Sequence, residues 1–394
     1  MPGLILSEEE QMLQSTLRDF VDNEITPKAK ESDEKAEFQW DNWRGLADLG
    51  LTGLGIDTKY GGSGPAGYRQ VSLAAEEVAR GDASTSVSWL AHLALGTACI
   101  ARFGTDEQKE RLLTPLATGE EVAAFGLTEP SGGSDAAALQ TTATERDGTF
   151  FLNGSKMFIT NASVASTIVV FATEDRSLGY KGVSAFVVRK DAPGLTINPM
   201  HGKLGMRSST TDEVVFQDTP VSSDNLLGER GRGFNLAMEI LTQSRIIIAA
   251  QSVGIGQSAL EAALRFAQQR ETFSKPIAQH QGIQFMLADM AVGVHSSRVA
   301  TMNAATLMDA GQPFLQEASI AKLMASEMCI DVANKAIQIH GGAGYFQEAG
   351  VERIFRDARV TTIYEGTSEV QRLLIARQLM AQWQHLFSEG FNSF

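Results

Sequence analysis

Two short segments of the chain carry side chains whose chemistry could serve catalysis or ligand binding. Glu365 lies in residues 363–370, which read IYEGTSEV and lead into an apolar helical pattern. A carboxylate there could act as a general base, although a Glu at a helix start usually caps the helix or interacts with its dipole. Residues 127–135 read LTEPSGGSD and offer backbone N–H groups and hydroxyls to a polar ligand, in a composition that ordinary loops share. These residues alone leave both alternatives open for each segment.

The histidines and cysteines do not have the spacing of a metal site. The histidines are His92, His201, His280, His295, His340 and His385. No two of them are four residues apart and none lies near a cysteine at zinc spacing, so we expect no bound metal. The chain also lacks a Gly-x-Ser-x-Gly elbow and a P-loop. The two cysteines, Cys99 and Cys329, are too few for a disulfide framework, which fits a reducing compartment.

Residues 254–259 match a dinucleotide-binding fingerprint in sequence but not in context. The segment Gly254-Ile-Gly256-Gln-Ser-Ala259 has the small residues that the fingerprint needs. The fingerprint also needs a preceding strand and a βαβ unit, whereas helical periodicity here continues through both glycines. We therefore favour close helix–helix packing over nucleotide binding at this segment.

The chain divides into a helical region, a strand region and a second helical region, and these must position the segments around Glu365 and residues 127–135. The first helical region meets the strand region near residue 122. Residues 7–120 have helical periodicity, and Ser7 precedes Glu10 at the spacing of a capping box. Short apolar runs then alternate with Gly and Pro; they are residues 167–171, 183–188, 195–197 and 214–216. Asp147-Gly148 and Asn153-Gly154 are favoured hairpin turns. This pattern predicts a small antiparallel barrel or sandwich.

The third region is helical from about residue 234 to about residue 388. Its stretches 234–269, 281–309 and 314–339 are long, rich in Ala and Met, and nearly free of Pro, which predicts bundle helices. The fold class expected from the three regions together is mostly helical with a central β domain.

Composition narrows the function classes. The 394 residues include 33 Lys+Arg and 47 Asp+Glu, a net charge of −14, which argues against binding nucleic acid over a wide surface. No apolar run reaches the roughly 18 residues of a membrane span. The acidic start lacks both a basic signal region and an Arg-rich transit character. We expect a cytoplasmic protein, or a mitochondrial matrix protein if a transit peptide has been removed.

Several segments in the same order make the chain resemble the acyl-CoA dehydrogenase family over about residues 5–385. They are LTEPSGGSD at 127–135, GSKMFITNA at 154–162, KLGMRSS at 203–209, GERGRGF at 228–234, RETFSKPIAQHQGIQFMLADM at 270–290, IQIHGGAGY at 337–345 and RIFRDARVTTIYEGTSEVQRLLIAR at 353–377. Each segment alone is weak, and together they are highly specific.

The resemblance implies a fold and an activity. The fold has an N-terminal helical domain (1–122), a middle antiparallel β-barrel (123–230) and a C-terminal four-helix bundle (231–394). The activity is oxidation of an acyl-CoA thioester, of short, medium or branched chain, to the trans-2-enoyl-CoA. FAD takes the hydride, an electron-transfer flavoprotein takes the electrons, and the enzyme is a homotetramer built as a dimer of dimers. The alternatives are an acyl-CoA oxidase that uses oxygen and an enoyl-CoA reductase that runs the reaction in reverse.

Glu365 matches the family's catalytic base through the YEGT motif. Removal of the weakly acidic α-proton of a thioester needs a positioned base, and burial beside an apolar acyl chain raises the pKa of a carboxyl group toward the working range. Some relatives carry the base just before an Arg on the first long C-terminal helix. That position is Ser244 here, before Arg245, and a serine cannot replace the carboxylate. A flavin-free scaffold would be favoured only if Glu365 and the 127–135 segment were replaced.

The resemblance also carries over ligand contacts, residue by residue. Positions that contact FAD within one subunit are Phe125, Leu127, Thr128, Ser134, Phe158, Ile159 and Thr160, with Thr367 and Glu369 near the adenosine. Positions that reach the FAD of a neighbouring subunit are Arg270, Thr272, Phe273, Gln281, Gln338 and Gly342. Positions near the substrate and its CoA moiety are Ser134, Leu241, Arg245 and Arg377.

Three positions depart from common family patterns. Phe158 stands where many relatives have Trp. Thr242 stands where many have an Asp that contacts the pantetheine arm, so that contact is not carried over. Ser86 stands near the position where glutaryl-type relatives place an Arg for a distal carboxylate, which argues against a dicarboxylyl substrate.

Overall fold

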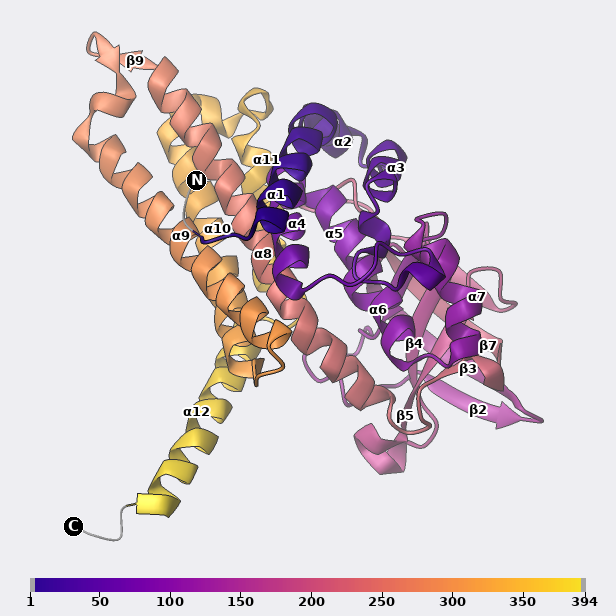
Figure 1. Ribbon diagram of the computed structural model, residues 1–394. Helices are drawn as coiled ribbons and strands as arrows, with labels where there is room; N and C mark the ends of the chain where they lie inside the picture. Colours follow the sequence, from indigo (N-terminus) through magenta and orange to yellow (C-terminus); the bar gives the residue numbers. More distant parts are fainter. Residues whose placement is uncertain (1–3, 391–394) are drawn as a thin grey trace.

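The computed structural model describes residues 4–390 and arranges them as helices, then a sheet, then helices (Figure 1). The first helices are α1 (Glu8–Phe20), α2 (Ala29–Lys35), α3 (Trp40–Asp48), α4 (Tyr68–Gly81), α5 (Ala83–Leu90), α6 (Ala98–Phe103) and α7 (Asp106–Ala117). The predicted capping box is confirmed, because the Glu10 N–H donates to the Ser7 hydroxyl at 3.2 Å and the Ser7 N–H donates to the Glu10 carboxylate at 2.9 Å.

The sheet follows in the middle of the chain and contains parallel as well as antiparallel pairs. Its strands are β1 (Ala123–Gly126), β2 (Thr142–Arg146), β3 (Thr149–Thr160), β4 (Thr167–Thr173), β5 (Val183–Arg189), β6 (Leu195–Pro199), β7 (Thr211–Ser222) and β8 (Leu226–Leu227). The order is β6-β7-β3-β2-β4-β5-β8, and β1 pairs with β4 in parallel.

The prediction of an antiparallel barrel is wrong. Among the described strands, β6 and β8 end the sheet and do not pair with each other, so the sheet stays open. Strand β8 has two residues and β6 is largely exposed and ends in Pro199, which leaves little edge for closure. Alternating apolar runs predict strands, but they do not predict which edges meet.

One of the two predicted hairpin turns is confirmed. Asp147-Gly148 joins β2 to β3, with both residues at positive φ. Asn153-Gly154 is not a turn, because it lies inside β3 where the pairing with β7 shifts register. Gly154 has φ of +142°, and a Cβ there would lie 2.7 Å from the Thr141 Cα, so glycine serves a β-bulge rather than a turn.

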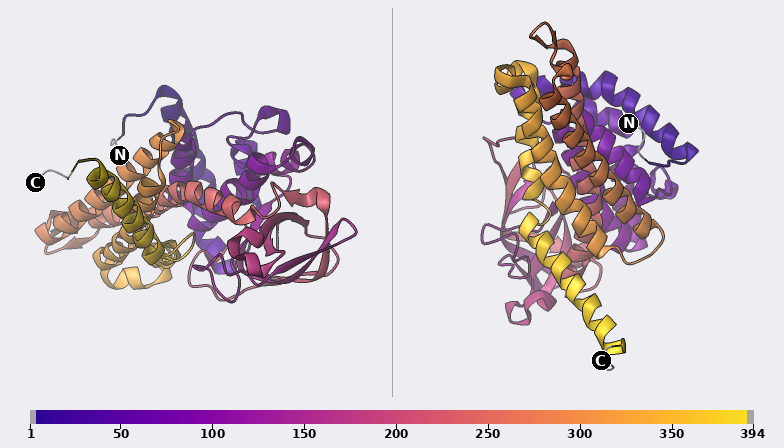
Figure 2. Two further views of the ribbon diagram at one scale, coloured as in Figure 1. Left: turned by 90° about the horizontal axis from the view of Figure 1, so that it is seen from below. Right: turned by 90° about the vertical axis from the view of Figure 1, so that its left-hand side faces the viewer.

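The last part of the chain is a bundle of long helices. They are α8 (Gly233–Gln269), α9 (Gln281–Asp309), α10 (Leu315–His340), the short α11 (Val351–Ala358) and α12 (Ser368–Gly390). These bounds confirm the three stretches predicted as bundle helices. Figure 2 shows α8, α9 and α10 side by side, while α12 projects away from the rest of the chain.

Helix α8 is the central element of the molecule. By length and composition it could cross a membrane, but 83% of its most apolar window is buried, as in a core helix. A Cβ on Gly254 would lie 2.2 Å from the Glu76 carbonyl oxygen of α4, and one on Gly256 would lie 2.8 Å from the Met328 sulfur of α10. These glycines therefore serve close helix packing, as predicted, and the residues directly before them belong to the same helix.

Helix α8 also sets the distance between the two ends of the bundle. Gly233 at its start packs against the backbone of Ser184 and Ala185 in the sheet. Its 37 residues rise about 55 Å, and the hairpin of β9 (Glu271–Thr272) and β10 (Lys275–Pro276) follows its far end. Figure 1 shows β9 at the opposite end of the molecule from the sheet.

Candidate active site

The Glu365 carboxylate is held between the last turns of the chain and helix α8. The residue lies just before α12, is partly buried, and has φ of +50°, which is uncommon outside glycine. The Ser244 hydroxyl on α8 donates a short hydrogen bond to its Oε2 atom. Glu365 is thus fixed by a tertiary contact rather than used as a helix cap.

Burial raises the pKa of Glu365 above the ordinary value for a carboxyl group. The Ser244 hydrogen bond and the charges of Lys322 and Arg245 oppose that rise. The result is a carboxyl group whose proton affinity is increased by desolvation and limited by one donor and two cations. This combination suits a general base that works near neutral pH.

Two donors hold the backbone that carries Glu365. The Lys322 ammonium donates to the Gly366 carbonyl at 2.8 Å, and the Gln371 amide donates to the same oxygen at 3.0 Å. Lys322 lies outside the motifs that predict the site. A sequence pattern could have pointed to this lysine. It lies on the same face of α10 as Ala318, Ala321 and Ala325, which are all buried, and a charged residue among buried alanines suggests a specific partner.

The 127–130 segment is pinned to strand β3. The Thr128 carbonyl accepts from the Met157 N–H at 2.9 Å, and the fully buried Lys156 ammonium donates to the Leu127 carbonyl at 3.3 Å. Lys156 also pairs with the buried carboxylate of Glu129 at 2.7 Å. Burial lowers the pKa of Lys156 to about 8, against the attraction of Glu129.

Glu129 and Lys156 belong to the motifs at 127–135 and 154–162, but the resemblance assigns neither residue a role. Along β3, Phe150, Leu152 and Lys156 occupy the same buried face. A lysine at a core position of a strand predicts a buried anion as its partner, because an unpaired buried charge is costly. The pair fixes the residues predicted to contact FAD.

The residues after Lys156 lie on a distorted part of β3. Pairing with β7 shifts register between Lys156 and Ile159, and Phe158 takes φ of +61° with 62% of its surface exposed. Bulges re-aim side chains next to ligand sites, so the exposed ring fits a stacking contact with a planar group such as a flavin. Ile159 is buried, so only its backbone could face a ligand, and Thr160 pairs with Thr211 of β7.

The substrate candidates on α8 lie close to the same region. Leu127 belongs to an apolar cluster against which both Phe125 and Leu241 pack. Four residues beyond Leu241, Arg245 is buried, and its Nε has no partner among the described residues. Ser134 is exposed in the 127–135 loop.

Thr242 contacts both its own helix and Arg245. Its hydroxyl donates to the Met238 carbonyl at 2.7 Å and accepts from the Arg245 guanidinium at 3.4 Å. Burial lowers the pKa of Arg245. Thr242 therefore offers a neutral acceptor to a buried cation at the position where relatives often have Asp.

A second group of predicted cofactor residues lies at the far end of the bundle. Phe273 is 90% exposed at the tip of the β9–β10 hairpin, and Thr272 shares a 3.1 Å hydrogen bond with His280. The rest of this group, Arg270, Gln281, Gln338 and Gly342, is also exposed. The length of α8 keeps them from the 127–135 loop of the same chain.

The remaining predicted residues lie on or beside α12. The Thr367 hydroxyl accepts from the Val370 N–H at 3.3 Å and so caps the helix start. Glu369 and Arg377 are exposed along the helix. Ser86, in contrast, is fully buried on α5, and its hydroxyl has no hydrogen-bond partner among the described residues.

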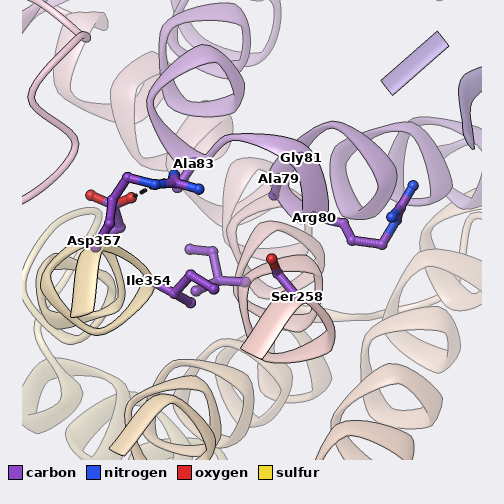
Figure 3. Close-up of a pocket in the computed structure, with 9 residues that line it drawn as sticks. Ala79, Arg80, Gly81, Ala83, Ser258, Ile354 and Asp357 are labelled. Carbon is purple, nitrogen blue, oxygen red and sulfur yellow. Dashed lines mark hydrogen bonds and ion pairs between the residues drawn. The ribbon is translucent and has the colours of Figure 1, made fainter. Parts of the chain in front are cut away.

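Two of the cavities in the described residues lie elsewhere. One, of about 10 Å³, lies between α4, α8 and α11 and has room for roughly one water. Figure 3 shows Arg80, Ser258 and Asp357 among the residues that line it. A cavity of about 640 Å³ at the far end of the bundle is bounded by Phe266 and His340, beside the exposed cofactor candidates. In the part of the chain that the structure describes, no cluster of three His, Cys, Asp or Glu could hold a metal.

Family models cover almost all of the chain. The N-terminal, middle and C-terminal domain models of acyl-CoA dehydrogenase match residues 7–120, 124–219 and 231–380. The chain belongs to the acyl-CoA dehydrogenase family. Members of this family are FAD flavoproteins, which confirms the predicted enzyme class and cofactor.

Individual relatives resemble the chain over nearly its full length. The short-chain specific mitochondrial enzyme of Rattus norvegicus is 44% identical over 96% of this chain and 92% of its own. The acryloyl-CoA reductase (NADH) of Anaerotignum propionicum is 42% identical over 95% of each chain.

Solved structures agree with this placement. Butyryl-CoA dehydrogenase from Megasphaera elsdenii has a TM-score of 0.93 and 41% identity over 96% of this chain and 99% of its own. A chain in a structure of an electron transferring flavoprotein of Acidaminococcus fermentans has a TM-score of 0.93 and 40% identity over the same shares.

Proposed function

We propose that this acyl-CoA dehydrogenase oxidises a short acyl-CoA to the trans-2-enoyl-CoA, with Glu365 as the base that removes the α-proton. The observation that carries the proposal is the Glu365 carboxylate, partly buried, with Ser244 as its donor. No second carboxylate occupies the alternative position, which is Ser244 itself. Short chain length is supported by the rat short-chain and Megasphaera butyryl-CoA relatives.

The residues of this chain would divide the work in a simple way. Glu365 takes the α-proton, and its desolvation supplies the basicity that a thioester needs. Bound FAD supplies the hydride acceptor for the β-hydrogen, so that the two C–H bonds are replaced by one C=C bond. Phe125, Leu127 and Leu241 form an apolar wall that fits an acyl chain and excludes water.

Binding of CoA would depend on local groups, because the chain carries a net charge of −14. Arg245 is the buried candidate and has an unpaired Nε, while Arg377 and Ser134 are exposed candidates. The N-terminus of α12, next to Glu365, adds partial positive charge.

Assembly into a homotetramer, as a dimer of dimers, would complete the cofactor site. Phe273 and its neighbours lie about 55 Å along α8 from the sheet, so a second subunit is needed to bring them to the flavin. Exposed apolar side chains at Phe285, Val292 and Val299 repeat along one face of α9, as expected for a helix that packs against another copy. Sedimentation of the flavin-loaded protein tests this, and a monomer with full flavin content would contradict it.

The electron acceptor and the direction are part of the proposal. An electron-transfer flavoprotein is the proposed acceptor, in a cytoplasmic setting, and the Acidaminococcus match supports it. Reduction of an enoyl-CoA is a second candidate, because the Anaerotignum relative is named a reductase and the same residues would return the α-proton.

The test is anaerobic mixing of the yellow protein with butyryl-CoA, octanoyl-CoA or palmitoyl-CoA, followed by flavin absorbance. We expect butyryl-CoA to bleach the flavin fastest, with little effect of palmitoyl-CoA. Absence of bleaching with all three acyl-CoAs would refute the dehydrogenase proposal. Rapid reoxidation by air, without an electron-transfer flavoprotein, would instead indicate an oxidase.

A further inference from the structure

Lys322 is a buried cation that neither takes the α-proton nor accepts the hydride in the proposed reaction. Its side chain is fully buried on the core face of α10, and it enters no ion pair among the described residues. A buried ammonium without a paired carboxylate is costly, and burial lowers the pKa of Lys322 to about 8. Packing alone does not explain a lysine at a position that alanine would fill.

Within the described residues, the hydrogen bond of Lys322 ends beside the carboxylate of the proposed base. Its ammonium donates to the Gly366 carbonyl at 2.8 Å, and Gln371 donates to the same oxygen at 3.0 Å. Gly366 has φ of +93°, and a Cβ there would lie 2.6 Å from the Gln371 amide nitrogen. The peptide after Glu365 is thus clamped from α10 and from α12.

The two hydrogen bonds to the Gly366 carbonyl hold a backbone conformation that is unfavourable by itself. Glu365 has φ of +50°, and such conformations in residues other than glycine cost conformational free energy. Surrounding contacts must supply that energy for the conformation to persist. Lys322 and Gln371 are the side chains whose hydrogen bonds hold this turn.

The charges around Lys322 also connect it to Glu365. The groups that face it are Glu365, Arg245, Cys329 and Glu327, and Glu365 is the anion that attracts it most. Glu327 lies on the surface and pairs with Arg372. Glu365 is itself also faced by Tyr68 of α4 and by Tyr364, whose pKa values are raised mainly by burial.

We propose that Lys322 is a positioning residue for proton abstraction: by fixing the Gly366 carbonyl it sets the place and the charge of the Glu365 carboxylate. This inference rests on the proposed function of Glu365. Lys322 does not touch the substrate, and it acts through the backbone and through its field. It therefore affects kcat and its pH dependence more than substrate binding.

The experiment compares three variants of the flavin-loaded protein. Lys322→Met keeps the length of the side chain and removes donor and charge, and Lys322→Gln keeps a donor without charge. Lys335→Met, on the same helix but in an ion pair with Asp331, is the control. Steady-state rates with butyryl-CoA are measured across pH, after the wild type has been shown to bleach.

We expect Lys322→Met to lower kcat on the order of 10²-fold, as a displaced catalytic group does, with a smaller change in KM. The acid side of its pH–rate profile moves to higher pH, because loss of the cation raises the Glu365 pKa. Lys322→Gln recovers part of kcat but keeps the shifted profile, and Lys335→Met behaves as wild type.

An unchanged profile in both Lys322 variants, with wild-type bleaching intact, would overturn the inference. If Lys322→Met does not fold or loses its flavin, Lys322→Gln decides in the same way. A wild type that does not bleach refutes the proposed function instead, so the two failures are distinguishable.

Discussion

The Ser244 hydroxyl donates to the Glu365 carboxylate across 121 positions of sequence. This contact joins the middle of the first bundle helix to the turn before the last helix, and it fixes the proposed base against the core. Ser244 stands at the position where some relatives carry the base itself. The same location thus supplies a partner for the carboxylate instead of a second carboxylate.

Ser244→Ala should shift the pH dependence of the reaction. Glu365 must be deprotonated to act, so the rate falls as pH drops through its pKa, which burial already raises. Loss of the donor removes about 1.5–3 kcal/mol of stabilisation from the carboxylate, or roughly one to two pKa units. We expect the acid side of the kcat/KM profile to move to higher pH by that amount.

Ser252→Ala is the matched control, because Ser252 is buried on the same helix, donates to the Ile248 carbonyl at 2.8 Å, and lies beside Cys329 rather than Glu365. Its profile should match that of the wild type. Equal shifts in both variants would mean that the effect comes from α8 as a whole and not from the contact with Glu365.

Lys156→Met should weaken flavin retention and stability together. The change leaves the buried Glu129 carboxylate unpaired, which costs about 3–5 kcal/mol, and frees the Leu127 carbonyl. Thermal unfolding and the flavin-to-protein absorbance ratio measure the two effects. Adding Glu129→Gln should restore part of the stability, since the two changes couple.

The exposed Lys190→Met serves as a control for the loss of one positive charge in the same domain. A Lys156→Met protein with normal flavin content and an unchanged melting temperature would show that the pair does not position the 127–130 segment.

Thr242→Asp should stabilise the apo fold and weaken CoA binding. Arg245 is buried with an unpaired Nε, and a carboxylate at position 242 would pair with it. The cation is then neutralised and attracts CoA less. We expect a higher Tm and a Kd for a non-reactive acyl-CoA analogue that is weaker by about tenfold, or ~1.4 kcal/mol.

Thr242→Asn, which has the same shape without charge, separates the electrostatic effect from the steric one and should bind the analogue nearly as the wild type does. Tighter binding by the Asp variant would mean that a direct contact with the pantetheine arm outweighs the charge of Arg245.

The helices and strands of this fold could be predicted from the sequence, but whether the sheet closes into a barrel could not. Long stretches rich in Ala and Met and nearly free of Pro located α8, α9 and α10 to within a residue or two, because helix propensity is a local property. The open sheet and the bulge at Gly154 were not predicted, since both depend on which strands lie side by side. The domain boundaries at residues 122 and 230 stay predictions.

Some residues of the candidate site could be predicted from sequence motifs, and others could not. Glu365 is proposed as the base through the resemblance of its motif, whereas its own position near a helix favoured a cap; the assignment stays a prediction. Lys322 and the Glu129–Lys156 pair were missed because their partners come from distant segments. In each case the sequence shows a lysine on an otherwise apolar face. The group that this lysine binds is visible only in the folded structure.

Glu365→Gln tests the central claim most directly, in an anaerobic mixture with butyryl-CoA followed by flavin absorbance. The amide keeps the size of the side chain and its contact with Ser244, so we expect a folded, yellow protein with normal flavin content. Its bleaching rate should fall by at least ~10²–10⁴-fold, the usual contribution of a positioned base. Bleaching at a rate near that of the wild type would contradict the assignment of Glu365 as the base.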